Sequence, residues 1–303
     1  TTYDEYIYGN HGRCATRCPE PEPGQIDGGQ AFDSDNETGI DVPVVPGDDS
    51  FNWGAQGSFS IEFWLRPDSD GCSGNQVVVG RDDGSTNLHW WTGCWAGGKA
   101  AFILGDRDGG EDTQVLVGTT DLTDGDWHHI VAVRAGSEYE NALYVDGMEE
   151  AFESEASYST GFDSLTAALN IGWLDLFHGY HFDGTVDEIA LYARALPSSE
   201  IRQHYIEGLA GRRYCETGEY APIIVSTPVT EATVGRLYTY AVEAAGDPVP
   251  TYTLVSHPSG MTIDSATGLI SWVPTVAQEG NHDVEVEASN SVGASTQPFT
   301  ISV

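Results

Sequence analysis

Three tryptophans fall within six residues, in the run Leu88-His-Trp-Trp-Thr-Gly-Cys-Trp95. The axial C–H groups of a sugar ring form an apolar patch that stacks on an exposed indole, so this density of tryptophan points to carbohydrate binding. On a strand, Trp90 and Trp91 point to opposite faces, and we expect one to fill the core and the other to be exposed. Further aromatic residues lie between Trp173 and His181. The predicted ligand-binding residues are Trp90, Trp91, Trp95, Trp173, His178 and Tyr180.

Catalytic patterns are weak by comparison. His128 and His129 are adjacent, but consecutive residues of a strand diverge, which disfavours a metal pair. The neighbouring acids Asp187 and Glu188 diverge for the same reason, whereas a glycosidase needs two carboxylates that flank one bond. The sequence contains no Gly-x-Ser-x-Gly elbow. We therefore expect a protein that is not an enzyme.

The charge balance is strongly acidic. The chain of 303 residues has 47 acidic and 12 basic side chains, for a net charge of -35, and the acids are spread along its length. Such a surface suits a saline medium, where counterions screen the self-repulsion. Carboxylate oxygens are also the ligands that Ca²⁺ prefers, so calcium is the predicted cofactor. The same negative field disfavours nucleic acid and anionic membranes as partners.

The five cysteines are Cys14, Cys18, Cys72, Cys94 and Cys215. They lack zinc-site spacing, which indicates an oxidising compartment with one thiol left over. We expect Cys72 to pair with Cys94. Cys215 is expected to pair with Cys14 or Cys18, because the ends of a β-sandwich domain usually lie close together. A fully reduced chain is the alternative.

The elements that must position these residues are strands. Residues 124–147 read as two alternating runs around a polar turn, which predicts a central β-hairpin. Pro197 to Tyr205 is the one predicted helix, with Ser198 as its N-cap. Trp64 and Trp127 are assigned to the core. The other predicted strands of this part cover residues 28–33, 40–43, 58–67, 76–80, 87–94, 100–104, 114–117, 168–172 and 185–192.

The sequence pattern changes near Glu219-Tyr-Ala-Pro222, and about seven short strands of alternating polarity follow. That spacing predicts a second, immunoglobulin-like sandwich with Trp272 at its centre. We therefore divide the chain into an extended segment (1–24), a first β domain (25–218) and an Ig-like domain (219–303). The fold class is all-β. No apolar run is long enough to span a bilayer.

The order of these pieces resembles a known family. The motifs Ser58-Phe-Ser-Ile-Glu-Phe-Trp-Leu-Arg-Pro, Asp124-Gly-Asp-Trp-His-His-Ile-Val-Ala-Val, Leu143-Tyr-Val-Asp-Gly and Phe182-Asp-Gly-Thr-Val-Asp-Glu-Ile are similar to those of laminin-G-like and pentraxin-type domains. This resemblance implies a concanavalin A-like jelly-roll sandwich over about residues 25–210. The run Pro258-Ser-Gly-Met-Thr-Ile-Asp resembles the Ig-like domains of prokaryotic surface proteins, which implies a spacer.

The resemblance also implies two calcium sites. In related folds the stretch at Asp187 clasps a cation with the N-terminal strand, where Asp27 and Asp33 lie. The second site is carried over by position from two pentraxin loops. The second loop here has one acid where pentraxins have several. The residues of this second site are Asp82, Asp83, Asn87 and Asp175.

These observations predict a secreted or cell-surface, non-catalytic binding module in a saline environment. Its expected ligand is a glycan or cell-surface polysaccharide, bound with calcium for adhesion or substrate anchoring. The alternatives are a structural or protein-binding segment of a larger surface protein and, third, an enzyme that acts on a polysaccharide. We expect no nucleic-acid partner and no membrane insertion.

Overall fold

The computed structural model describes residues 2–3, 12–14, 17–45, 49–69, 71–82, 84, 89–105, 113–154, 161–162, 164, 166–174, 180–214 and 218–303. The chain forms two compact units, residues 1–202 and 203–303. The division falls within α1 (Ser198–Leu209), which extends four residues beyond Tyr205, where the helix predicted from the sequence ends. The sequence-based boundary at 218/219 lies further toward the C-terminus.

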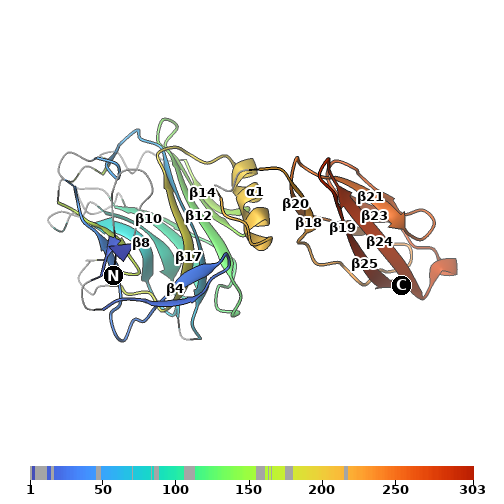
Figure 1. Cartoon of the computed structure of the whole chain (residues 1–303), viewed down its shortest axis with the longest axis horizontal. Helices are drawn as coiled ribbons and strands as arrows, with labels where there is room; N and C mark the ends of the chain where they lie inside the picture. Colours follow the sequence, from blue (N-terminus) through green and yellow to red (C-terminus); the bar gives the residue numbers. More distant parts are fainter. Residues whose placement is uncertain are drawn as a thin grey trace. The chain divides into compact units, whose positions relative to one another are not determined.

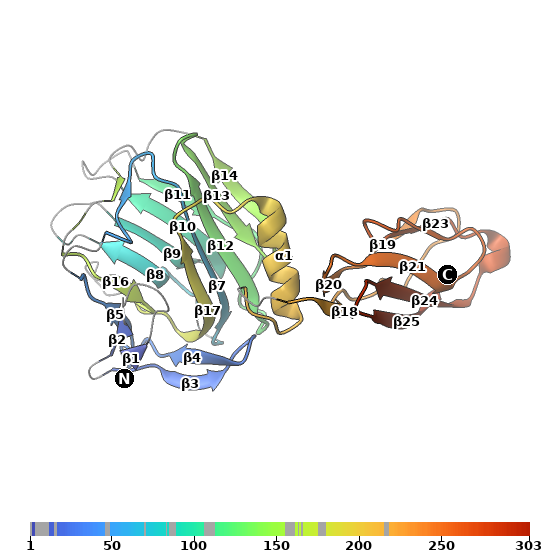
Figure 2. The same ribbon diagram turned by 45° about the horizontal axis from the view of Figure 1, so that its top comes forward.

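The first unit consists of two packed antiparallel sheets, shown from two directions in Figures 1 and 2. The strands of the eight-stranded sheet are, in spatial order, β1 (Thr2–Tyr3), β2 (Gly12–Arg13), β5 (Ile40–Val42), β16 (Leu169–Ile171), β8 (Gln76–Asp82), β9 (His89–Trp95), β10 (Lys99–Gly105) and β11 (Gln114–Val117). The strands of the seven-stranded sheet are β14 (Met148–Glu153), β13 (Glu140–Val145), β12 (His128–Ala135), β7 (Phe59–Pro67), β17 (Gly184–Tyr192), β4 (Gly28–Phe32) and β3 (Glu20–Pro23). Two short strands, β6 (Trp53–Gly54) and β15 (Gly161–Phe162), form a separate pair.

The core lies between the two sheets because inward residues alternate along each strand. Phe59, Ile61, Phe63 and Leu65 of β7 all belong to it, as the alternation predicts. The predicted hairpin is confirmed as β12 and β13, with β12 central between β13 and β7. Both faces of this hairpin are buried, because Leu196 and Ile201 pack on its outer face.

Trp64 and Trp127 were both assigned to the core from the sequence, but the structure places them in different environments. Trp64 is fully buried, but on the outer face of the seven-stranded sheet, where its ring lies 5.0 Å from that of His129. Trp127 was assigned to the core, and this prediction is wrong. It is half-buried, and the Arg66 guanidinium lies 5.0 Å from its ring centroid. Trp127 immediately precedes β12 and therefore lies outside the paired part of the sheet.

The second unit is a small sandwich of three antiparallel sheets. The sheets are β18 (Tyr220–Ile224) with β20 (Ala244–Asp247), β19 (Tyr238–Ala241) with β23 (Leu269–Trp272) and β22 (Thr262–Ile263), and β21 (Thr251–Ser256) with β24 (Asn281–Ser289) and β25 (Ala294–Ser302). A 3-10 turn, η1, covers Val276–Gln278. Trp272 is buried in the core of this unit, as predicted. Jelly-roll and Ig-like architectures are thereby confirmed.

Candidate functional site

Strand register places one row of residues across the outer face of the eight-stranded sheet. Arg13 lies opposite Asp41, and Asp41 lies opposite Asn170. The row continues through Gly80 to Trp91, in the middle of the sheet. Beyond Trp91 come Ile103 and Val115, the latter on the edge strand β11. Because side chains opposite one another in a sheet share a face, segments more than 100 residues apart meet along this row.

Trp173 stands over the polar end of the row, just after β16. Its indole N–H donates a hydrogen bond to Asp41 Oδ1 at 3.0 Å, and the Asn170 amide donates to the same oxygen at 2.9 Å. Its ring stacks on His181 with centroids 5.8 Å apart and planes 9° apart. Gly39 makes room for the indole, since a Cβ there would lie 2.4 Å from Trp173 Cδ1. The half-buried ring is therefore held in one orientation.

An open cleft of about 260 Å³ lies beside this ring. Arg13 and Asp41 contribute a cation and an anion to its wall. The Arg13 guanidinium makes no hydrogen bond or ion pair within the described part of the chain. Arg17, in contrast, forms an ion pair with Glu37. The cleft is lined by Arg13, Cys14, Arg17, Glu37, Gly39, Asp41, Trp173 and His181.

His181 is the titratable group beneath the ring. Its Nδ1 lies 3.3 Å from the carbonyl oxygen of Thr38. Burial lowers the pKa of His181 below its ordinary value of 6.5, and this outweighs the bond to Thr38, which raises it; nearby Arg17 lowers it further. The imidazole is therefore neutral at pH 7, and Arg13 is the cation that the cleft can offer to a ligand.

The predicted aromatic residues separate into three environments. Predicting Trp90 as a ligand residue was wrong. It is fully buried between the sheets, with its ring 5.1 Å from Trp53 and 6.0 Å from Phe59. The expectation that Trp91 would then be exposed also fails, because Trp91 faces outward but is only 5% exposed, beneath other side chains. Trp95 stacks on Trp91, Tyr180 packs against the same buried cluster, and both are half-buried. His178 lies outside the described residues.

The proposed cation clasp at Asp187 is occupied by backbone amides. The buried carboxylate accepts hydrogen bonds from the N–H groups of Ile26 and Glu188, each at 2.8 Å. Burial raises the pKa of Asp187 above its ordinary value, although these amides oppose the shift. Asp27 is exposed, and Asp33 caps the turn that contains Asn36. These contacts join the loop before β4 to β17.

For the second predicted calcium site, only Asp82 is described, and its Oδ1 accepts a bond from Gly84 N–H. Asp83, Asn87 and Asp175 lie outside the described residues. Within the ranges that the structure describes, no three acidic, histidine or cysteine side chains are grouped so as to hold a metal. Calcium therefore stays a prediction.

The disulfides confirm one pairing and correct another. Cys72 is bonded to Cys94, as predicted. Cys18 is bonded to Cys14, not to Cys215, which lies outside the described residues. The Cα atoms of Cys14 and Cys18 are 5.2 Å apart, within the range that a disulfide spans. Arg13 and Arg17 each precede one of these two cysteines, and both arginines line the cleft.

The two adjacent histidines take part in separate structural contacts. His128 Nδ1 lies 2.9 Å from Asp146 Oδ2, and its Nε2 lies 3.1 Å from Asp124 Oδ1. On the opposite face, His129 Nε2 lies 2.8 Å from Glu62 Oε1, and both side chains are fully buried. Neither histidine lines the cleft.

The His128 contacts predict a pH-dependent stability. Burial lowers the pKa of His128, but Asp146 and Asp124 raise it by more, so its folded-state pKa lies above 6.5. The stabilisation is complete below pH 6.5 and is lost as the pH rises through the folded-state pKa. His128→Gln should therefore lower the free energy of unfolding more at pH 5.5 than at pH 8.5. Urea titrations measure this, with His257→Gln, at an exposed site, as the control. An equal loss at both pH values would contradict the assignment.

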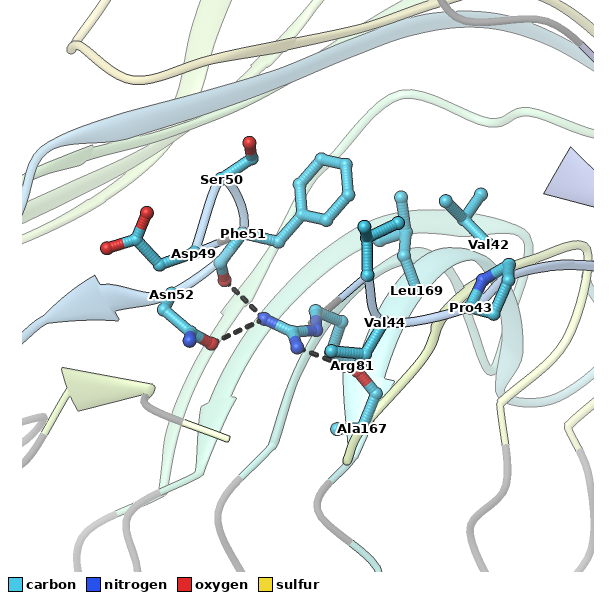
Figure 3. Close-up of a pocket in the computed structure, with 11 residues that line it drawn as sticks. Val42, Pro43, Val44, Asp49, Ser50, Phe51, Asn52, Arg81, Ala167 and Leu169 are labelled. Carbon is cyan, nitrogen blue, oxygen red and sulfur yellow. Dashed lines mark hydrogen bonds between the residues drawn. The ribbon is translucent and has the colours of Figure 1, made fainter. Parts of the chain in front are cut away.

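A second, smaller pocket is filled by an arginine rather than open to a ligand. Its volume is about 10 Å³, and Figure 3 shows the Arg81 side chain within it. The guanidinium donates to the carbonyl oxygens of Phe51 and Ala167, at 2.5 and 2.7 Å, and to Asn52 Oδ1 at 3.0 Å. Arg81 therefore joins the segment before β6 to the segment before β16.

Sequence comparison identifies the class of this protein. Residues 36–202 match the concanavalin A-like lectin/glucanases superfamily, and the chain belongs to that family. Residues 221–303 match the family described as "Putative Ig domain". No curated protein sequence is detectably similar to the chain.

Three solved structures are similar to this chain. The binding domain of Paraclostridial Mosquitocidal Protein 1 is 12% identical, with a TM-score of 0.52 over 97% of this chain and 87% of the other. Domain 4 of AbnA, an extracellular arabinanase from Geobacillus stearothermophilus in complex with arabinotriose, is 16% identical (TM-score 0.47; 67% and 85% covered). A Ruminococcus gnavus sialidase CBM40 bound to α2,3-sialyllactose is 17% identical (TM-score 0.43; 60% and 95% covered).

Sequence reasoning found Trp173 but missed most of the cleft around it. The one local signal was the pair of arginines beside Cys14 and Cys18. Nothing in the sequence connects Asp41 to Trp173, which lies 132 positions away. In the described part of the chain, no helix has the length and apolar character needed to cross a bilayer.

Proposed function

We propose that the jelly-roll unit is a non-catalytic carbohydrate-binding module whose sugar lies in the cleft beside Trp173. The observation that carries this proposal is the half-buried indole, held by Asp41 and His181 at an open cleft that also contains a guanidinium. Membership of a lectin and glucanase superfamily supports it. A fixed aromatic ring with a few convergent polar groups is the usual composition of a sugar site.

The polar groups suit a pair of neighbouring sugar hydroxyls. Asp41 Oδ1 accepts hydrogen bonds from Trp173 and Asn170, whereas no described residue bonds to Asp41 Oδ2. Oδ2 can therefore accept a hydrogen bond from a hydroxyl group of the ligand. Arg13 lies opposite Asp41 in the strand register. In the proposed complex its guanidinium donates a hydrogen bond to the oxygen of the neighbouring sugar hydroxyl. Charge-assisted hydrogen bonds of this kind are stronger than neutral ones. The apolar face of the sugar ring then rests against the indole.

The biological setting belongs to the same proposal. Disulfides suit an oxidising compartment, and the acidic surface suits a saline one. We infer a secreted or cell-surface protein in which the module serves adhesion or substrate anchoring and the Ig-like unit is a spacer. Calcium is proposed as a cofactor near Asp82, where Asp83, Asn87 and Asp175 are the remaining candidates.

A glycan array that carries neutral and acidic oligosaccharides tests this proposal. Wild type should bind at least one glycan, and Trp173→Ala should weaken that binding by about 30-fold, because truncating a central tryptophan costs about 2 kcal/mol. Trp127→Ala removes a half-buried tryptophan that lies next to the other sheet, just before β12, and this variant should bind normally. If calcium supports the site, EDTA lowers binding and added Ca²⁺ restores it.

The outcomes separate the alternatives. If EDTA leaves glycan binding unchanged, calcium is not a cofactor of the site, and the proposed sugar site stands without it. If no glycan binds at any calcium concentration, the proposal is wrong, and a structural or protein-binding segment is favoured instead. Release of reducing ends from a bound polysaccharide shows an enzyme instead.

A further inference from the structure

A second aromatic surface lies on the same face of the sheet, next to the cleft. Trp91 and Trp95 are four residues apart on β9, about 13 Å along an extended strand. Their rings nevertheless stack, with centroids 6.3 Å apart and planes 18° apart. Gly93 lies between them in the strand, and a Cβ there would lie 2.2 Å from the carbonyl oxygen of Gln76 in β8, so the position requires glycine. This arrangement leaves Trp91 buried and Trp95 half-exposed.

Tyr180 completes this surface from the loop that carries the cleft residues. Its carbonyl oxygen accepts a hydrogen bond from Val77 N–H at 2.9 Å, which joins the backbone of Tyr180 to β8. The Tyr180 ring and the Trp95 ring both pack on a layer of buried side chains, and Tyr180 is itself half-buried. The next residue, His181, stacks on Trp173 in the cleft. The buried layer consists of Val77, Trp91, Ala101, Ile103 and Leu174.

The two rings form a rigid and partly accessible platform. Aromatic side chains whose lower faces are packed lose little conformational entropy when a ligand covers the upper face. From Asp41, in the cleft, to Trp91 the row crosses three strand intervals, or about 14 Å. A chain of several sugar rings spans that distance, whereas a single sugar does not.

We propose that Trp95 and Tyr180 form a second subsite for the glycan held at Trp173, so that the ligand is an oligosaccharide chain and not a single terminal sugar. This inference rests on the proposed function of the cleft. The rings accept the apolar faces of successive sugars, while Arg13 and Asp41 bind the hydroxyls of the ring in the cleft. Affinity should therefore rise with chain length.

Isothermal titration with size ladders tests this directly. The probes are cello-, xylo-, arabino- and chito-oligosaccharides of two to six rings, together with the ladder of any glycan found on the array. For wild type the longest ligand should bind about tenfold more tightly than the shortest, the gain expected of one further stacking contact. Trp95→Ala should reduce that gain and leave the shortest ligand unaffected. Trp173→Ala should weaken both, and Trp127→Ala neither.

Tyr180→Gly is the second variant, chosen because its backbone cost is small. Tyr180 has φ of 36°, in the left-handed region where glycine is favoured. It should reduce the gain with length as Trp95→Ala does, and near-UV circular dichroism establishes that both variants are folded. Equal affinity for short and long ligands, or a length gain that both variants retain, overturns the second subsite while Trp173→Ala still tests the cleft. If no ladder binds at all, the proposed function fails together with this inference.

Discussion

Replacing Glu62 with alanine should lower the free energy of unfolding of the jelly-roll unit by about 3 kcal/mol. The carboxylate is fully buried on the outer face of the seven-stranded sheet. It lies 2.8 Å from His129 Nε2 through one oxygen and accepts the Tyr192 hydroxyl, at 2.9 Å, through the other. Removing it takes the acceptor away from two polar groups, and each polar group left without a partner inside a protein costs about 1–3 kcal/mol.

Urea unfolding followed by tryptophan fluorescence measures this loss. Seven of the eight tryptophans lie in the first unit, so the signal reports mainly on the jelly roll. Glu138→Ala changes an exposed glutamate and should shift the free energy by less than about 0.5 kcal/mol. Glu62→Gln keeps an acceptor oxygen and should lose less than Glu62→Ala. A Glu62→Ala protein as stable as wild type would show that these bonds contribute no net stability.

Trp90→Ala should destabilise the same unit by about 3–5 kcal/mol, as truncation of a large core aromatic does. The indole is fully buried and meets Trp53, Phe59 and Phe162, the last with centroids 6.5 Å apart. The two sheets cannot close fully on the vacated volume, because other large rings hold them apart. Glycan affinity, measured where the variant is folded, should equal that of wild type.

The matched comparison is Trp95→Ala, which removes the same side chain five positions along the same strand. That variant should keep most of its stability, because Trp95 is half-exposed. Trp90→Phe provides the test if the alanine variant does not fold, and should fall between it and wild type. A stable Trp90→Ala protein that has lost glycan binding would restore the ligand role and refute the core assignment.

Local patterns were sufficient for most of the fold. Alternating runs predicted the strands that became β7, β12 and β13, because a period of two is a direct consequence of strand geometry. The Asp146-Gly147 turn closes β13 onto β14, and Asp146 has φ of 51° as that turn requires. The strand β3 was missed because Glu20-Pro-Glu-Pro23 has no apolar alternation; only its pairing with β4 makes it a strand.

The candidate site was only partly predictable. Period two places Trp90 and Trp91 on opposite faces, but it does not say which face meets the second sheet. Packing made Trp90 the core residue, and Trp91 is buried on the outer face in a cluster with Leu174, where Trp95 stacks on it. The cysteine pairing failed for a related reason. The proximity of chain ends suggested Cys215, whereas a bond four residues away was available to Cys18.

The amino-acid sequence by itself determined that this protein is an all-β jelly roll followed by an Ig-like unit, with Trp173 among its candidate ligand residues. These features follow from local periodicity, turns and side-chain type. Only the tertiary structure decided that Trp173 meets Asp41 and Arg13, because their contact depends on the order and register of β2, β5 and β16. That order results from closing two sheets over one core, a long-range outcome that no local pattern encodes.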